Sequence, residues 1–325
     1  MKSLTQPFLI DDNPFDGPVM VTGAAGCIGA WVLAILKRSG ISCIAADIAI
    51  DSRRLELIVG PDEAADYVWQ GLDVTDGAAV SNFVKDNAID AIIHLAGLQV
   101  PFCAADPARG ARVNVEGTVN ILQAARENSV SRLAYASSVA AVCFPPGQGF
   151  KETLYGAYKV ANEQTALVYW QDWQVPSVGL RPNVVYGLGR DQGMSSLTTA
   201  AIHAAACHET FEIPFTGPYS WLHAGEAASA FIAAVSRVGE NAAVYDLNGP
   251  CVTVEDGINI LKNLAPNVRI SSAGAPFPFP PDLDETKTHA NLPDYKRISV
   301  EDGIASTYRA FCQLAAEDRL PALPV

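Results

Sequence analysis

Three side chains in the middle of the chain have the types and the spacing that hydride transfer requires. Tyr155 and Lys159 are four residues apart in a stretch with helical periodicity, so they share one face of a helix. Ser138 lies just past the end of a predicted strand, at the edge where open α/β sheets bind their ligands. A phenol with an ordinary pKa of about 10 needs nearby positive charge to act as a base near neutral pH, and Lys159 can supply that charge.

In this hypothesis the phenol of Tyr155 removes a proton from a substrate hydroxyl while a hydride moves to NAD⁺, and it returns the proton in the reverse direction. Ser138 hydrogen-bonds the same oxygen, and Lys159 also holds the nicotinamide ribose. Ser137 and Tyr158 are weaker choices, because Ser137 should point to the other side of the strand and Tyr158 is out of step with Lys159. A Tyr-x-x-x-Lys spacing is common by chance, so the hypothesis also needs a dinucleotide site.

A glycine-rich turn near the N-terminus predicts such a site. The apolar run 19–21 is followed by Thr-Gly-Ala-Ala-Gly-Cys-Ile-Gly, in which Gly23, Gly26 and Gly29 recur at every third position, and a helical pattern begins at about Ala30. Backbone N–H groups in a turn of this kind attract a pyrophosphate, and the positive end of the helix dipole adds to the attraction. Tight turning and close packing are the structural alternative for the three glycines.

An acidic residue favours the dinucleotide interpretation and indicates which dinucleotide binds. Asp47 ends the second apolar run, 24 residues after the first glycine of the turn, where a carboxylate can accept hydrogen bonds from both adenosine ribose hydroxyls. It also repels a 2′-phosphate, so we expect NAD rather than NADP, although Arg53 and Arg54 follow closely enough to weaken the preference. Asp73 and Val74 would suit the adenine amine and ring, with a helix N-cap as the alternative role of Asp73.

These residues need a framework that brings them together, and the rest of the sequence predicts one. After a loop-like leader, the first fifty residues have the pattern of a strand, a turn, a helix and a strand, which is one βαβ unit. Further strands are expected at 66–70, 91–95, 132–136, 175–180 and 243–247, and helices at 77–87, 111–128, 156–170 and 227–238. This alternation predicts an α/β fold, a Rossmann-type doubly wound parallel sheet.

The pattern loosens from Pro182 onward, where loops rich in Gly and Pro surround helical stretches at 194–206, 254–264 and 300–314. We therefore expect a smaller, interleaved C-terminal substrate domain. The predicted NAD-binding Rossmann domain comprises 17–181 plus about 222–248, and the substrate-binding domain comprises about 182–221 plus 249–325. The alternating Pro and Phe residues at 276–281 predict a stiff loop that packs its Phe side chains.

Bulk composition excludes several classes of protein. The 325 residues are 49% hydrophobic and 18% charged, as in well-packed globular proteins. A net charge of −13 argues against a nucleic-acid partner. The absence of a long apolar run and the polar, acidic start predict neither membrane insertion nor export, hence a soluble cytoplasmic protein. The seven cysteines are widely spread without Cys-x-x-Cys spacing, so we expect reduced thiols and no metal site.

Taken in order, the motifs resemble those of the extended short-chain dehydrogenases/reductases of the NAD-dependent epimerase/dehydratase type. They are the glycine turn at 22–29, Asp73-Val74, His94-Leu95-Ala96-Gly97, Asn114, Ser137-Ser138, Tyr155-Gly-Ala-Tyr-Lys159 and the segment 181–187. The resemblance implies that Leu95 to Gly97 line the cofactor, that Asn114 supports the active-site helix, and that the backbone from Pro182 to Val184 flanks the nicotinamide. It also implies a homodimer that includes the Tyr155 helix.

The predicted site residues form three sets. The catalytic set is Ser138, Tyr155 and Lys159. The set expected to bind the cofactor is Gly23, Ala25, Gly26, Cys27, Ile28, Gly29, Asp47, Asp73, Val74, Leu95, Ala96, Gly97, Asn114, Tyr155, Lys159, Pro182, Asn183 and Val184. The set expected to contact a small polyhydroxylated or carboxylated substrate is Gln99, Ser138, Asn183, Arg190, Gln192, Trp221 and His223, each with a core or surface alternative.

Departures from the family pattern argue against two of the family's reactions, those on nucleotide sugars and dehydration. Many relatives that act on nucleotide sugars carry an Arg before an aromatic-apolar-His segment to clamp the diphosphate, and the corresponding stretch 218–226 contains neither Arg nor Lys. Related dehydratases place an acidic pair after the catalytic Ser, whereas Val139 and Ala140 follow here, so dehydration is not expected. In the loop after Tyr186-Gly187, Arg190 is a candidate to bind a substrate carboxylate, with solvent exposure as its alternative.

Three functions agree with these motifs. The first is net oxidation or reduction of a small hydroxylated substrate, such as a sugar, a sugar acid or a hydroxy acid, by transfer of a hydride to or from NAD. The second is a sugar epimerase, acting on a free or nucleotide-linked sugar through a keto intermediate without net cofactor turnover. The third is a non-catalytic NAD-binding sensor, which is disfavoured because both Tyr155 and Lys159 are present.

Overall fold

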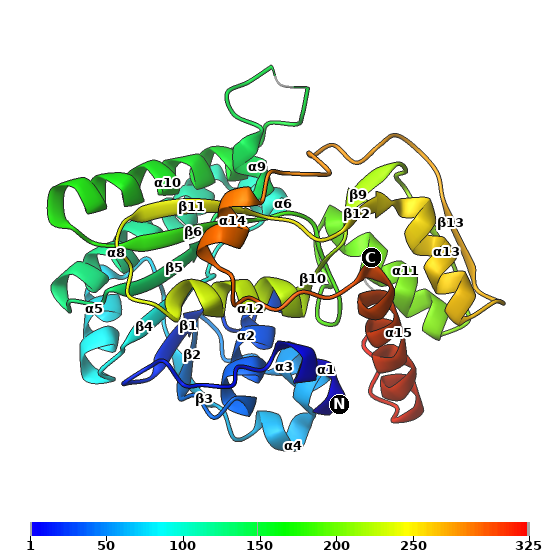
Figure 1. Ribbon diagram of the computed structural model, residues 1–325, viewed down its shortest axis with the longest axis horizontal. Coiled ribbons are helices and arrows are strands. Elements are labelled where there is room, and N and C mark those ends of the chain that lie inside the picture. Colours follow the sequence, from blue (N-terminus) through cyan, green and yellow to red (C-terminus); the bar gives the residue numbers. More distant parts are fainter. Residues whose placement is uncertain (1, 148, 324–325) are drawn as a thin grey trace.

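The computed structural model describes residues 2–147 and 149–323, and its centre is a seven-stranded parallel sheet (Figure 1). The strand order is β3-β2-β1-β4-β5-β6-β11, and every pairing within the sheet is parallel. The strands are β1 (Val19–Thr22), β2 (Cys43–Asp47), β3 (Val68–Gly71), β4 (Ala91–His94), β5 (Arg132–Ala136), β6 (Ser177–Pro182) and β11 (Ala242–Leu247). The chain order reverses at β1, which gives a topological switch point between β1 and β4.

Helices bury both faces of this sheet, because alternate residues of each strand point to opposite sides. Val19 and Val21 of β1 join a core with α2 (Cys27–Arg38) and α12 (Ala224–Val235). Met20 joins a second core with α5 (Gly77–Asp86), α8 (Gly117–Glu127) and α10 (Leu154–Trp173). The two cores confirm the predicted doubly wound Rossmann-type fold.

The remaining part of the chain forms a smaller lobe beside the sheet (Figure 1). Its short strands pair as β8 (Thr210–Ile213) with β13 (Arg269–Ser272), β9 (Pro218–Ser220) with β12 (Cys251–Thr253), and β7 (Val185–Tyr186) with β10 (Leu222–His223). Its helices are α11 (Leu197–Ala206), α13 (Val254–Leu264) and α15 (Val300–Ala316). Between β10 and β12 the chain returns to the sheet as α12 and β11, so the lobe interleaves with the Rossmann fold.

Several short elements were not expected from the sequence. They are α3 (Arg53–Val59), α4 (Pro61–Ala64), α6 (Val100–Ala105), α7 (Pro107–Ala111), α9 (Val139–Val142) and α14 (Thr286–Asn291). The short helical elements η2 (Arg112–Glu116) and η3 (Met194–Ser196) lie inside the stretches 111–128 and 194–206 that were expected to be helical. The leader is not a loop throughout, because it contains α1 (Lys2–Thr5) and the 3-10 turn η1 (Gln6–Phe8). Phe8 is fully buried and stacks on His223 with ring centroids 5.6 Å apart, so tertiary packing orders this segment.

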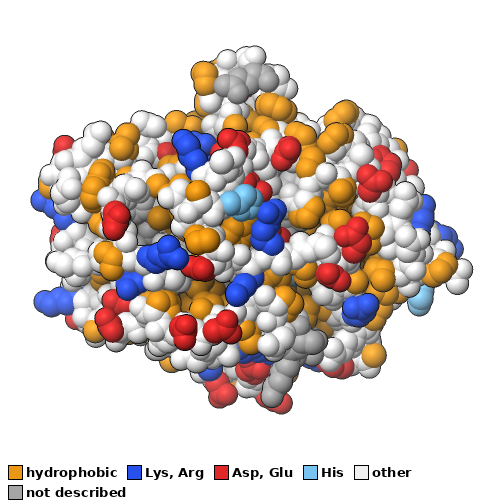
Figure 2. All heavy atoms as spheres, in the orientation of Figure 1, with side chains coloured by type: hydrophobic (Ala, Val, Ile, Leu, Met, Phe, Trp, Pro, Cys, Tyr) orange, Lys and Arg blue, Asp and Glu red, His pale blue; other side chains and the backbone are white. Residues whose placement is uncertain are grey.

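In the face shown in Figure 2, acidic and basic side chains are interspersed with apolar ones instead of gathering in a patch of one sign. Among the described residues, no helix combines the length and the apolar character that crossing a membrane requires. All seven cysteines are free thiols.

Candidate active site

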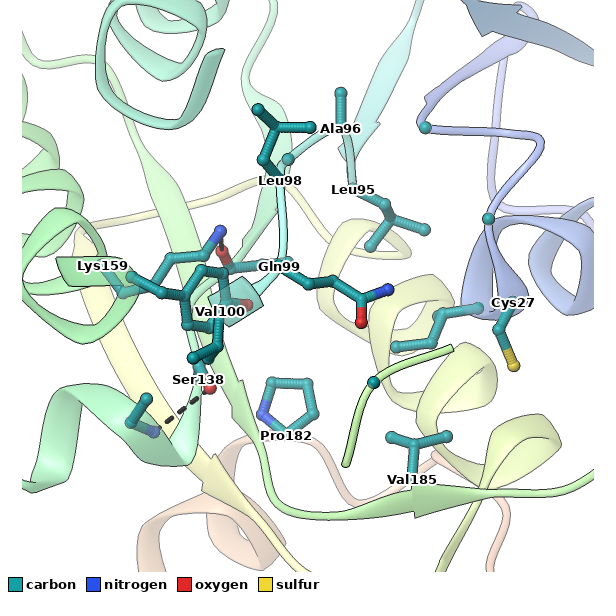
Figure 3. A pocket seen from close by; sticks show the side chains of 18 of the residues that line it. Cys27, Leu95, Ala96, Leu98, Gln99, Val100, Ser138, Lys159, Pro182 and Val185 are labelled. Atoms are coloured by element: carbon teal, nitrogen blue, oxygen red, sulfur yellow. Dashed lines mark hydrogen bonds between the residues drawn. The ribbon is translucent and has the colours of Figure 1, made fainter. Parts of the chain in front are cut away.

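The predicted catalytic and cofactor residues meet at one cavity of about 550 Å³ at the carboxyl edge of the sheet. Its walls come from the segments that follow β1, β4, β5 and β6, which end side by side because these strands are parallel neighbours. Figure 3 shows Lys159 and Ser138 on one side of the cavity and Cys27 on the other, with the Gln99 side chain reaching between them. The cavity extends from the glycine turn to the smaller lobe.

Close backbone packing explains why the turn after β1 uses glycines. Thr22 pairs with His94 in the β1–β4 register, so the residues that follow them approach each other directly. Gly23 has φ of +66°, and a Cβ there would lie 2.6 Å from the Ala96 nitrogen. A Cβ at Gly29 would lie 2.4 Å from the Gly23 carbonyl oxygen. The N-terminus of α2 therefore packs closely against the strand ends and lines the cavity, as a pyrophosphate cradle requires.

Asp47 stands at the end of β2 on the wall of the same cavity. Its carboxylate accepts a hydrogen bond from the Ala25 N–H at 3.0 Å, which fixes the acid beside the glycine turn. The two arginines that follow have other partners. Arg53 pairs with Asp51 at 2.6 Å, and Arg54 pairs with Asp191 at 2.7 Å and donates to the Ala25 carbonyl of the glycine turn at 2.8 Å. The residues present fit an adenosine diphosphate moiety whose ribose hydroxyls bond to Asp47.

The catalytic set is positioned by two helix N-termini. Thr153 caps α10 by accepting a hydrogen bond from the Gly156 N–H at 3.0 Å, which places Tyr155 in the first turn and Lys159 one turn later. Lys159 Nζ lies 5.3 Å from the centroid of the Tyr155 ring. Ser138 caps α9, where its Oγ accepts a hydrogen bond from a backbone N–H of that helix at 3.1 Å. All three side chains line the cavity.

Burial dominates the acid–base properties of this set. It raises the pKa of Tyr155 to about 12, against which a hydrogen bond with Ser138 and the positive charge of Arg190 act in the lowering direction. Burial lowers the pKa of Lys159 to about 8, while the nearby Cys103 raises it. Lys159 Nζ donates a hydrogen bond to the Ala136 carbonyl at 2.6 Å. A phenol in this environment needs further positive charge before it can lose its proton near pH 7.

The two side chains considered weaker choices have other partners. The Ser137 hydroxyl donates to the Glu163 carboxylate at 2.5 Å, and Arg181 pairs with the same carboxylate at 2.7 Å. This network ties the middle of α10 to β5 and β6 behind the catalytic residues. The Tyr158 hydroxyl donates to the Pro107 carbonyl at 2.9 Å.

Most residues expected to bind the cofactor line the cavity, and two do not. The lining set is Gly23, Gly26, Cys27, Ile28, Gly29, Asp47, Asp73, Val74, Leu95, Ala96, Gly97, Tyr155, Lys159, Pro182, Asn183 and Val184. Ala25 lies in the turn behind its wall. Asn114 is buried, and its amide donates to the Gly110 and Leu98 carbonyls at 2.9 and 3.2 Å. Asn114 thus supports the loop after β4 from behind.

The residues expected to contact substrate divide into three groups. Gln99, Asn183 and Arg190 line the cavity, although the Asn183 amide is already bonded to the Asn248 and Pro280 oxygens. Gln192 lines an adjoining cavity of about 440 Å³. Trp221 and His223 lie outside the cavity lining and are buried in the core, where each packs against the Tyr186 ring. We therefore leave Trp221 and His223 out of the proposed substrate site.

Other cavity residues were not singled out by the sequence. Phe277 and Phe279, from the Pro-Phe tract, form an apolar wall, and Ser195 and Arg109 add polar groups. The Phe residues were expected to pack, but nothing in the tract indicated that they pack beside the nicotinamide end of the cavity. Ser195 and Arg109 carry no sequence signal of this kind.

Comparison with known proteins identifies the family. A model described as the NAD dependent epimerase/dehydratase family matches residues 19–247. The chain belongs to this family. Its cofactor is NAD, and the glycine turn and Asp47 are the parts of the cavity that fit it.

Individual relatives are distant. UDP-glucose 4-epimerase of Mycolicibacterium smegmatis is 25% identical over 90% of this chain and 97% of that protein. The chain spans about half the length of several other curated relatives that it matches. A UDP-glucose 4-epimerase structure from Thermotoga maritima has a TM-score of 0.77 at 19% identity over 92% and 99% of the two chains. An L-threonine dehydrogenase structure from Clostridium difficile has a TM-score of 0.77 at 18% identity over 94% and 99%. These structures show the shared fold.

Proposed function

We propose that the protein is an NAD-dependent oxidoreductase that transfers a hydride between the cofactor and a small hydroxylated substrate, such as a sugar, a sugar acid or a hydroxy acid. The observation that carries this proposal is the convergence of Ser138, Tyr155 and Lys159 on the cavity that also contains the glycine turn. Bound NAD⁺ supplies the hydride acceptor, and the chain supplies the proton transfer and the positioning.

Tyr155 is the group that moves the substrate proton. Its phenol accepts the proton of the substrate hydroxyl during oxidation and returns it during reduction. Lys159 makes this feasible, because an ammonium whose Nζ lies 5.3 Å from the centroid of the Tyr155 ring stabilises the phenolate. A positively charged nicotinamide ring in the cavity acts in the same direction.

Ser138 and Lys159 also have positioning roles. The Ser138 Oγ accepts one hydrogen bond from the α9 backbone, which fixes its orientation and leaves its proton for Tyr155 or for the substrate oxygen. Lys159 uses one of its three N–H donors on the Ala136 carbonyl, so two remain for ribose hydroxyls of the cofactor. The Phe277 and Phe279 wall excludes water from the reacting carbon.

A small substrate is favoured over a nucleotide sugar. The stretch that holds a diphosphate-clamping Arg in many relatives lacks any basic residue here, and its Tyr219 and Trp221 are buried in the core. Phe277 and Phe279 of the Pro-Phe tract add an apolar wall to the same cavity.

The first experiment measures NADH formation at 340 nm with purified protein and NAD⁺. The panel contains free aldoses, uronic and aldonic acids, small hydroxy acids and nucleotide sugars. A substrate-dependent rise that Tyr155→Phe abolishes, with NAD affinity retained, supports the dehydrogenase and names its substrate class. A function that is unchanged in Tyr155→Phe would instead support a non-catalytic NAD sensor.

A second candidate is an NAD-dependent sugar epimerase, which the similarity to UDP-glucose 4-epimerase favours. It uses the same three catalytic side chains but returns the hydride to the other face of a keto intermediate. Absence of net NADH with every compound, together with a changed sugar stereocentre detected by NMR, would support this candidate. NAD that stays bound through purification would agree with it.

We further propose that the enzyme works as a homodimer in the cytoplasm. The helix α10 exposes Leu167, Val168 and Trp173, which a second copy would cover. The free cysteines agree with a reducing compartment. Analytical ultracentrifugation tests the dimer: Val168→Glu should yield monomers, whereas a wild-type monomer would contradict the proposal.

A further inference from the structure

Arg190 carries a charge that no acidic side chain in the cavity neutralises. It lines both the main cavity and the adjoining one, in the loop between β7 and η3. Within the described ranges 2–147 and 149–323, no carboxylate lies within ion-pair distance of its guanidinium. The adjacent Asp191 is held by Arg54 at 2.7 Å.

Three titratable groups that the charge of Arg190 influences are neutral at pH 7. Its positive charge acts to lower the pKa of Tyr155, Cys27 and Tyr219, so the guanidinium is close to all three. Burial outweighs this effect at each of them. It raises the pKa of Tyr155 to about 12 and that of Cys27 to about 11, and it also raises the pKa of Tyr219. None of these groups therefore supplies a negative charge.

The guanidinium also has hydrogen-bonding capacity left. Arg190 Nη2 donates to the Ser195 Oγ at 2.5 Å, whereas Nε is buried and has no hydrogen-bond partner among the described residues. A Cβ at Gly193 would lie 2.8 Å from Gln99 Oε1 and 3.7 Å from Arg190 Nη2, so the amide and the guanidinium converge beside this glycine. A buried donor without a partner and an uncompensated charge both cost free energy, and a bound anion removes both costs.

We propose that Arg190 binds a carboxylate of the substrate, so that the enzyme acts on small hydroxylated carboxylic acids. This inference rests on the hydride-transfer function proposed above. A guanidinium presents two parallel N–H donors that match the two oxygens of a carboxylate, and the Ser195 hydroxyl adds a donor at the same place.

The carboxylate remains unchanged in the reaction. The carbon that bears the reacting hydroxyl loses a hydride to NAD⁺, and the hydroxyl proton passes to Tyr155 and then to solvent. The products are the corresponding oxo acid, NADH and one proton, so atoms and electrons balance. Because Arg190 and Tyr155 line the same cavity, one small molecule can carry both the anchored carboxylate and the reacting hydroxyl.

Matched pairs of compounds test the carboxylate directly. D-gluconate is compared with D-glucitol, D-glucuronate with D-glucose, and D-glycerate with both glycerol and glycerol 3-phosphate. For the pair that reacts best, we expect the wild type to prefer the acid over its neutral partner by about 100-fold in kcat/KM. Arg190→Gln should lose this preference, because kcat/KM falls much further for the acid than for its neutral partner, and Arg190→Lys should recover part of it. Arg237→Gln is the matched control, since Arg237 is exposed and pairs with Asp294 at 2.6 Å.

A binding measurement keeps the inference separate from the proposed function. The Tm of Tyr155→Phe protein loaded with NAD is recorded with each acid and each neutral partner, in the presence and absence of Arg190→Gln. If no compound yields NADH, the proposed function fails, and the Tm shifts alone decide the inference. A shift caused by an acid, absent with its neutral partner and lost with Arg190→Gln supports it. Equal behaviour of acids and neutral partners, no shift with any acid, or a preference for glycerol 3-phosphate over D-glycerate would overturn it.

Discussion

The two sides of the cavity are built in different ways. On the dinucleotide side, the lining follows directly from strand ends: Gly23 follows β1, Asp47 ends β2 and Leu95 follows β4, so the sheet register fixes their relative positions. On the substrate side, Arg190 and Phe277 come from loops that are 87 residues apart and whose approach depends on tertiary packing. Residues placed by strand ends suit a cofactor whose shape is constant. Residues placed by loops suit a substrate, because loops can change without disturbing the sheet.

We expect the largest loss of activity when Lys159 is replaced, since this residue lies where the dinucleotide side and the substrate side of the cavity meet. Lys159→Met removes the ammonium that stabilises the Tyr155 phenolate, so we expect kcat for oxidation to fall by about 10³-fold. The remaining activity should rise only at higher pH than in the wild type, because the phenol keeps its raised pKa. Steady-state pH profiles measure this. Tyr158→Phe is the control, since its hydroxyl bonds to Pro107, and an equal loss in that variant would contradict the assignment.

The dinucleotide side should tolerate almost no added volume. Gly29→Ala places a methyl group 2.4 Å from the Gly23 carbonyl, so we expect about 1–3 kcal/mol of destabilisation and about 100-fold weaker NAD binding. Calorimetry and thermal unfolding measure both effects. Gly71→Ala is the matched control, because a Cβ at Gly71 meets nothing within 4 Å. Normal NAD affinity in Gly29→Ala would show that this turn does not hold the pyrophosphate.

The charge of Asp47 should account for part of the NAD affinity. Asp47→Asn keeps the size of the side chain but replaces a charged acceptor, so we expect NAD to bind about 10-fold to 100-fold more weakly. The ratio of NADP to NAD affinity should rise, because the variant no longer repels a 2′-phosphate. Titration with each dinucleotide measures this. Asp51→Asn, which removes the partner of the exposed Arg53, should leave both affinities unchanged.

Stability should depend on pH through one buried histidine in each region. Burial lowers the pKa of both His94, in β4, and His223, in β10, to about 3. The unfolded chain takes up these protons near pH 6.5 whereas the folded chain does not, so each histidine stabilises the fold above pH 6.5 and loses that contribution as pH falls. Between pH 6.5 and 5 we expect each to cost about 2 kcal/mol.

Urea unfolding between pH 7 and 5 measures this loss. His94→Asn and His223→Asn should each flatten the pH dependence, and the exposed His208→Asn should leave it unchanged. A similar slope in all four proteins would mean that other groups govern acid sensitivity.

The sequence was most informative where a local pattern determines a global position. The β1–turn–α2 unit is predictable because an apolar strand, three glycines and a helical period must place the turn at the carboxyl edge of a parallel sheet. The same geometry places Ser138 after β5 and Tyr155 in the next long helix. Even so, the predicted helix start is wrong by three residues. The helix α2 begins at Cys27, so the second half of the glycine motif belongs to the helix and not to the turn.

The substrate side was less predictable for physical reasons. Strand pairs of two to four residues, such as β7 with β10, are too short for hydrophobic alternation to distinguish them from loops. Trp221 and His223 have polar atoms suited to a substrate, yet tertiary packing buries both, while Phe277 reaches the cavity from 56 residues further along the chain than Trp221. Local sequence does not encode which loops meet.

The central claim is that Tyr155 mediates hydride transfer in a cavity that binds NAD. The most direct test mixes NAD-loaded protein with an excess of the best substrate in a single turnover and follows absorbance at 340 nm. We expect a transient or lasting NADH signal in the wild type and none in Tyr155→Phe, with NAD bound equally by both proteins. This holds for a dehydrogenase and for an epimerase. The same signal in both proteins, or none in the wild type despite bound substrate, would contradict the account.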